Sequence, residues 1–341
     1  DELGHTSVNY ATDRDYGGSS GFQTGSTYKL FTLGAWLNSG KKLLDHVDGR
    51  VRQWDAGDFK ARCGNVATPW APNNISKEPE DLTVVQATAL SVNTAFADMA
   101  HQLDLCDIRD VAMAFGVHRA DGNELSYVPS SILGINEIAP ITMAAALGGI
   151  ANNGTFCTPI AIDKVIKRAT KTEMAIPTSK CSQAVTPEVS AGMLYAMKRV
   201  VSGGTGGASS TGDGVMLAGK TGTTDSGVHT WMTGASTAVA TATWVGNVSG
   251  STSLSRISLN GKAGNTVRHD IWRSIMQVAN KQYPTGVFPN PPQSMIDATM
   301  ITVPQVSGQA PSDAEQNILI NDLNATIVVK KVASSQPAGT V

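Results

Sequence analysis

Three short polar motifs constrain this chain more than any other feature of its sequence. In chain order they are Ser26-Thr27-Tyr28-Lys29, Ser91-Val92-Asn93 and Lys220-Thr221-Gly222-Thr223. Each is a pattern that chance alone often produces in a chain of 341 residues. The surrounding apolar residues predict that the first motif opens a helix, the second lies on a helix and the third lies on a strand. The information is therefore in the order and setting of the three motifs together.

The first motif has the chemistry of an activated nucleophile. A serine hydroxyl is a poor nucleophile until a base removes its proton. Ser26 and Lys29 are three residues apart, about one helical turn, so their side chains are expected to face the same way. Lysine can act as the base only where burial and a neighbouring cation lower its pKa. The sequence thus predicts a nucleophilic Ser26 with Lys29 beside it.

The wider pattern predicts an α+β chain, with helices first and an antiparallel sheet after them. Helices are expected over residues 26–37, 82–105, 107–115, 137–152, 187–201 and 266–281. Residues 159–178 alternate like strands, and later strands are expected over 215–223, 230–235 and 239–245. Four prolines between positions 284 and 292 mark a linker. The closing helix is expected to pack on the sheet.

Taken together, the motifs resemble the signature of penicillin-binding proteins and class A β-lactamases. Residues 23–29 are similar to the Q-P-G-S-x-x-K of class A penicillin-binding proteins, and residues 218–224 to their A-G-K-T-G-T-T. The likeness covers about residues 6–285 and is strongest to actinobacterial members. It implies a transpeptidase domain over residues 1–285 with the penicillin-binding transpeptidase or serine β-lactamase-like fold, an antiparallel sheet flanked by helices.

The resemblance implies a catalytic role for residues of all three motifs. Ser26 would be acylated, Lys29 would be its base, and Lys220 would be the cationic neighbour that lowers the pKa of Lys29. Ser91 would relay a proton to the leaving group. Asn93 would hydrogen-bond the amide chain of the substrate.

By the same resemblance, the third motif would hold the substrate. Thr221 and Thr223 would bind its terminal carboxylate, and Gly222 would let it approach the strand edge. The backbone N–H groups of Ser26 and Thr223 would form an oxyanion hole. No metal and no cofactor is implied. One position departs from the family pattern, because Thr230 stands where an acidic residue is usual.

The implied activity is that of a serine D,D-transpeptidase. Such an enzyme crosslinks peptidoglycan stem peptides through an acyl-enzyme, using a D-Ala-D-Ala donor and an amine acceptor, and β-lactams inhibit it; a carboxypeptidase side activity fits the same residues. The resemblance places the domain on the cell-wall side of the bacterial plasma membrane, preceded in the complete protein by sheet strands, a glycosyltransferase domain and a membrane anchor. A net charge of −2 without a basic run argues against a nucleic-acid partner.

The four cysteines allow two disulfides if the protein is exported. Cys157 and Cys181 flank a predicted β-hairpin, which makes them the better candidate pair, and Cys63 with Cys106 would follow by elimination. Four buried free thiols are an equally weighted alternative, because a thiol packs as a small apolar group.

The end of the chain has a different character. Residues 286–300 are predicted to be a proline-rich linker. Residues 301–341 resemble a PASTA module that lacks its last strand, a small α+β domain associated with penicillin-binding proteins. A spacer role for this segment weighs at least as much as ligand binding.

Two other functions stay open. A hydrolase, either a D,D-carboxypeptidase or a β-lactamase, could use the same nucleophile. A class A β-lactamase needs a glutamate to activate water, yet neither Glu124 nor Glu137 stands in the E-x-x-x-N arrangement of that family. A catalytically silent wall sensor is the third reading, and the intact motif residues argue against it.

Overall fold

The computed structural model describes residues 5–299 and 305–320, and the chain forms two compact units. The first unit, Asp1–Ala298, contains the helices and sheets that position the three motifs. The second is Thr299–Val341, whose described part holds helix α9 (Pro311–Ile320). Most of the PASTA-like segment predicted over 301–341 lies outside the described residues, so it stays a prediction.

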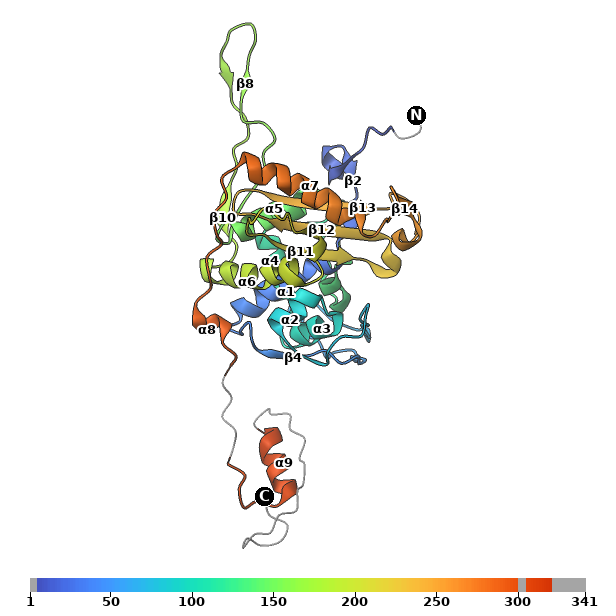
Figure 1. Cartoon of the computed structure of the whole chain (residues 1–341), viewed down its shortest axis with the longest axis vertical. Helices are drawn as coiled ribbons and strands as arrows, with labels where there is room; N and C mark the ends of the chain where they lie inside the picture. Colours follow the sequence, from blue (N-terminus) through green and yellow to red (C-terminus); the bar gives the residue numbers. More distant parts are fainter. Residues whose placement is uncertain (1–4, 300–304, 321–341) are drawn as a thin grey trace. The chain divides into compact units, whose positions relative to one another are not determined.

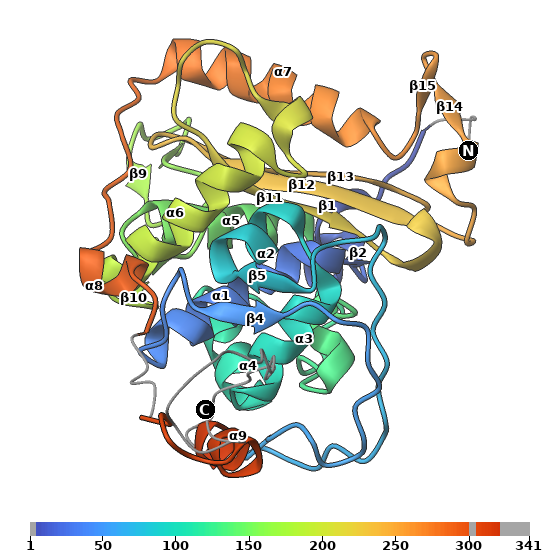
Figure 2. The same cartoon turned by 60° about the horizontal axis from the view of Figure 1, so that its bottom comes forward.

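A three-stranded antiparallel sheet crosses the first unit (Figures 1 and 2). Its strands, in order across the sheet, are β11 (Ala218–Thr223), β12 (His229–Ala235) and β13 (Ala240–Gly246). Helix α7 (Val267–Gln282) covers one face, where Trp272 and Met276 are buried. Helices α5 (Pro140–Ala151) and α6 (Pro187–Gly203) lie on the other face. The α+β arrangement predicted from the sequence is confirmed.

Within residues 5–299, no fourth strand joins this sheet. The early strands form pairs of their own: β1 (Asn9–Asp13) pairs in parallel with β2 (Gly18–Ser19), and β3 (Phe22–Gln23) is antiparallel to β6 (Glu137–Ile138). The strands that the resemblance places ahead of this domain therefore have no counterpart in the described sheet. The pairing of β3 with β6 fixes the segment that leads into the first motif.

Helix α1 (Lys29–Asn38) forms the centre of the helical part. Every residue from Lys29 to Leu37 is buried, as expected for a helix that is apolar nearly all round. It packs against α3 (Asn93–His101), α4 (Leu105–Ala114) and α6. The first turn of α1 thereby carries its lysine into the core.

The single helix predicted over 82–105 is wrong, because the chain breaks at the second motif. Helix α2 (Val84–Leu90) begins with a capping box between Thr83 and Gln86 and ends at Ser91. Ser91 has a left-handed backbone (φ 60°), which terminates the helix before α3 starts at Asn93. The second motif thus lies in a tight break between two helices and not on one helix.

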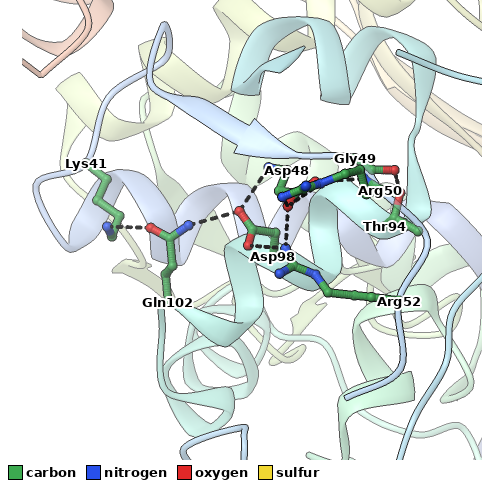
Figure 3. Close-up of polar contacts among 8 residues, drawn as sticks. All are labelled: Lys41, Asp48, Gly49, Arg50, Arg52, Thr94, Asp98 and Gln102. Carbon is green, nitrogen blue, oxygen red and sulfur yellow. Dashed lines mark hydrogen bonds and ion pairs between the residues drawn. The ribbon is translucent and has the colours of Figure 1, made fainter. Parts of the chain in front are cut away.

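A polar network fastens the long loop between β4 (His46–Asp48) and β5 (Asp81–Thr83) to α3 (Figure 3). The Asp98 carboxylate accepts from the Asp48 N–H at 3.1 Å and from Arg52 Nη2 at 3.1 Å. The Thr94 hydroxyl donates to the Gly49 carbonyl at 2.5 Å. The start of the loop is therefore tied to the helix that begins with the second motif.

Both disulfides are present in the structure. Cys157 of β7 (Thr155–Cys157) stands opposite Cys181 of β10 (Cys181–Gln183) and is bonded to it, and Cys63 is bonded to Cys106 of α4. Between the first pair the chain projects from the body as a hairpin (Figure 1). Its strands, shorter than the sequence predicts, are β8 (Val165–Ile166) and β9 (Glu173–Met174).

Residues 286–298 belong to the first unit, although the sequence predicts a linker over 286–300. Phe288 is buried, and helix α8 (Gln293–Ile296) accepts hydrogen bonds from the backbone of Leu43 and Leu44. The remaining short strands, β14 (Ser258–Leu259) and β15 (Lys262–Ala263), pair with each other. Among the described helices, none combines the length and apolar character that crossing a membrane requires.

Candidate active site

Ser26 lies on a short 3₁₀ turn, Gly25–Tyr28, immediately ahead of α1. The sequence places it in the first helical turn, and the tighter turn keeps it one step outside the α-helix. Ser26 is 8% exposed, whereas Lys29 is fully buried. Ser26 lines the cleft, whereas Lys29 does not reach the surface.

The Lys29 amine is held by the second motif. Its Nζ donates to the Ser91 carbonyl oxygen at 2.6 Å and to Asn93 Oδ1 at 2.7 Å, and lies 3.4 Å from Ser91 Oγ. The Asn93 side chain also donates to the Asn73 carbonyl at 2.7 Å. Asn93 therefore holds the Lys29 amine, and its expected hydrogen bond to the substrate amide stays a prediction.

The Ser91 hydroxyl lies between the two lysines of the motifs. Lys220 Nζ donates to Ser91 Oγ at 2.6 Å and to the Thr221 carbonyl at 3.0 Å. Lys220 belongs to β11 and Lys29 to α1. Through these two lysines, Ser91 links the strand β11 to the helix α1. All three motifs thus converge on one hydroxyl.

Burial changes the protonation of both lysines. It is the main cause that lowers the pKa of Lys29 well below its ordinary value, and the charge of Lys220 lowers it further. Burial also lowers the pKa of Lys220 to about 7, with a smaller contribution from Arg268. The lowered pKa of Lys29 favours the uncharged amine, which is the form that can accept a proton from serine.

Alternation along β11 separates the residues of the third motif. Thr221 and Thr223 line the cleft that Ser26 opens into, whereas Gly222 faces the other way. A Cβ on Gly222 would lie 2.3 Å from the Thr24 carbonyl oxygen and 3.0 Å from Thr27 Cγ2. This glycine is needed so that the strand can pack on the serine-bearing turn, a different reason from the substrate approach inferred from the sequence.

Residues 6–277 match the family model described as the penicillin binding protein transpeptidase domain. The chain belongs to this family. Penicillin-binding protein 1A of Aquifex aeolicus is 29% identical to it over 271 residues, which are 76% of this chain and 35% of that protein. The chain therefore spans about a third of the length of that relative.

Solved structures show the same fold. The penicillin-binding protein PonA1 of Mycobacterium tuberculosis superposes with a TM-score of 0.69 at 24% identity, over 84% of this chain and 76% of that one. The same protein in complex with penicillin V gives a TM-score of 0.67 at 25% identity, over 83% and 76%. The fold predicted for the transpeptidase domain is confirmed.

The cleft of this transpeptidase domain has a volume of about 320 Å³. Besides the motif residues, it is lined by side chains that no sequence motif marks, among them Asn74, Glu78, Thr205, Asn265 and Arg268. They come from the long loop, from the turn after α6 and from the start of α7. No motif marks these positions, because only tertiary packing brings the three segments to the cleft.

Thr230 and its neighbour His229 on β12 make contacts within the fold. Thr230 is fully buried, and its hydroxyl donates to the Val245 carbonyl at 3.3 Å, so the residue at the usual acidic position is satisfied within the sheet. His229 lies beside the rings of Phe22 and Trp244, and burial lowers its pKa. Among the described residues, no group of three or more His, Cys, Asp or Glu side chains could hold a metal ion.

Replacing Gly222 with alanine is expected to damage the transpeptidase site through packing. The added methyl would force β11 away from the turn that carries Ser26, costing about 1–3 kcal/mol of unfolding free energy. A displacement on the order of 1 Å can slow a reaction about 10²-fold. Gly203→Ala is the control, because a Cβ there meets nothing within 4 Å. Urea unfolding and the rate of penicillin acylation report both effects; parental values for Gly222→Ala would contradict this account.

Proposed function

We propose that this domain is a serine D,D-transpeptidase of peptidoglycan synthesis. Ser26 Oγ attacks the carbonyl of the penultimate D-alanine of a stem peptide, and the last D-alanine leaves as the free amino acid. The amine of a neighbouring stem peptide then attacks the acyl-enzyme and restores Ser26. The observation that carries this proposal is the convergence of Lys29 and Lys220 on Ser91, in a cleft that Ser26 also lines.

Lys29 is the base for acylation in this proposal. A neutral lysine amine has two hydrogens and one lone pair. If the hydrogens are donated to the Ser91 carbonyl and Asn93 Oδ1, the lone pair stays available for the Ser26 proton. The lowered pKa of Lys29 favours this neutral form.

Ser91 carries the proton to the leaving group. Its hydroxyl accepts from Lys220 at 2.6 Å, which leaves its own hydrogen free to be donated to the departing amine nitrogen. Ser91 can then regain a proton from the lysine side of the network. In the second half-reaction the same groups deprotonate the acceptor amine, because the reverse path uses the same transfers.

The oxyanion of the tetrahedral intermediate is proposed to bind the backbone N–H groups of Ser26 and Thr223. The close approach of the two segments supports this assignment, since a Cβ on Gly25 would lie 2.8 Å from the Thr223 nitrogen. Losing one such donor typically slows acyl transfer about 10²–10³-fold. Thr221 and Thr223 are proposed to contact the terminal carboxylate from the cleft side of β11.

We further infer the setting in which the domain works. The domain is proposed to work on the outer side of the plasma membrane, because its proposed substrates, the stem peptides, are found there. The two disulfides fit this setting, because disulfides persist outside the cytoplasm. The complete protein is proposed to carry a glycosyltransferase domain and a membrane anchor. The segment 301–341 is proposed to be a PASTA-like spacer.

Mass spectrometry of the protein treated with benzylpenicillin tests this function. The intact mass is expected to increase by one drug molecule, with the adduct on Ser26 within the tryptic peptide 15–29. Slow loss of the adduct is expected for a transpeptidase, and rapid loss would favour the hydrolase. No adduct, or an adduct elsewhere, would contradict the proposal.

A further inference from the structure

Arg268 extends the cleft beyond the three motifs. It is the second residue of α7, and it lines the same cleft as Ser26, Thr221 and Thr223. Helix α7 packs on β12 and β13, so the arginine reaches the cleft from a different element than the threonines of β11. Its position adds a positive charge to the cleft that those threonines also line.

This arginine lacks the counterion that comparable arginines have. Five arginines are partly buried in the part of the chain that the structure describes, and four of them pair with a carboxylate, namely Arg52, Arg109, Arg119 and Arg273. Arg268 is the fifth, and no ion pair joins it to a described carboxylate. The nearest carboxylate along the helix, Asp270, is paired with Lys262 and Arg273.

Much of the hydrogen-bonding capacity of Arg268 is also unused. Its Nη1 donates to the Asn265 carbonyl, but its Nε is buried without a partner in the described structure. A buried cation and an unsatisfied N–H are both costly unless a ligand satisfies them. Burial lowers the pKa of Arg268 to about 10, so the group is still charged at neutral pH. These features fit a binding site for an anion.

The neighbouring hydroxyl groups complete a polar wall. Thr205, from the turn after α6, has its Oγ1 2.6 Å from Thr221 Oγ1, and both residues line the cleft. The Thr205 N–H donates to the Ala89 carbonyl at 3.0 Å, which fixes this turn against α2. Thr205 therefore orients the Thr221 hydroxyl from a third element.

We propose that Arg268 binds the terminal carboxylate of the donor peptide, and the equivalent carboxylate of a β-lactam, together with Thr221 and Thr223. This inference rests on the proposed transpeptidase function and names the residue that gives it selectivity for a free carboxyl terminus. A guanidinium matches a carboxylate geometrically and forms charge-assisted hydrogen bonds with it. The bound carboxylate would compensate the charge of the partly buried Arg268 guanidinium. This pairing would strengthen binding of the donor peptide.

The test compares a β-lactam that has a carboxylate with one that lacks it. Second-order acylation rates are measured for benzylpenicillin and for its methyl ester, using the whole chain and its Arg268→Gln and Arg268→Lys variants. Arg268→Gln is expected to slow acylation by the acid about 10- to 100-fold and to leave the rate with the ester within about twofold. Arg268→Lys keeps the charge but loses the planar guanidinium. Its acylation rate with the acid is expected to lie between those of the parent and Arg268→Gln.

The design separates binding of the carboxylate from other effects of the charge. Arg268 also lowers the pKa of Lys220, and losing that influence would change both rates equally. Lys281→Gln removes a positive charge from the last turn of the same helix and is expected to change neither rate. Equal losses with acid and ester, or a parental rate of Arg268→Gln with the acid, would overturn the inference. A parent protein that forms no adduct on Ser26 would instead refute the transpeptidase proposal itself.

Discussion

Replacing Ser26 with alanine is expected to abolish the covalent penicillin adduct and to reduce transpeptidation by about 10⁶-fold, the scale seen when a serine nucleophile is removed. The hydroxyl oxygen is the atom that forms the acyl bond, and no neighbouring group can replace it. Lys29 and Lys220 are both fully buried and hydrogen-bonded to Ser91, and neither lines the cleft as Ser26 does. Gel fluorescence with a labelled penicillin measures the effect directly.

The Ser26→Ala protein is expected to keep its fold. The change removes one oxygen from the lining of the cleft, and such a change typically alters the unfolding free energy by less than about 1 kcal/mol. Ser182, an exposed serine on β10, provides the matched control. The labelled penicillin is expected to modify Ser182→Ala to the same extent as the parent protein. Equal labelling of Ser26→Ala and the parent would mean that another residue is the nucleophile.

Replacing Lys29 with methionine is expected to slow acylation by about 10²–10⁴-fold, the usual contribution of a general base. Methionine fills much of the same buried volume but has no amine, and Ser26 keeps its place on the preceding turn. The hydrogen bonds to the Ser91 carbonyl and Asn93 are lost as well. Stopped-flow rates with a chromogenic β-lactam report the change.

The pH dependence of acylation identifies the role of the lysine. The base must be uncharged, so the rate of the parent is expected to rise with pH as Lys29 loses its proton. Because burial and Lys220 lower the pKa of Lys29, this rise is expected far below the pH at which an exposed lysine titrates. Lys29→Met is expected to lose the rising limb. A variant that keeps the limb would show that another group is the base.

Much of the fold could be predicted from the sequence, and the errors have local physical causes. The late strands and the helices around them follow from apolar periodicity, which depends on neighbours only a few residues apart. The helix predicted over 82–105 failed because one residue, Ser91, adopts a left-handed backbone that periodicity does not reveal. The helix predicted from residue 137 starts at Pro140 instead, since Glu137 and Ile138 pair with β3.

The sequence alone determined that Ser26 has a lysine one turn away, and that the three motifs together resemble those of one family. Only the tertiary structure decided which of these residues contact one another. In the folded chain Asn93 accepts a hydrogen bond from Lys29, Gly222 packs closely against the turn that carries Ser26, and Arg268 lines the cleft. The reason is physical: the spacing within a turn is set by bonded geometry, whereas a contact between distant segments exists only after the core has packed.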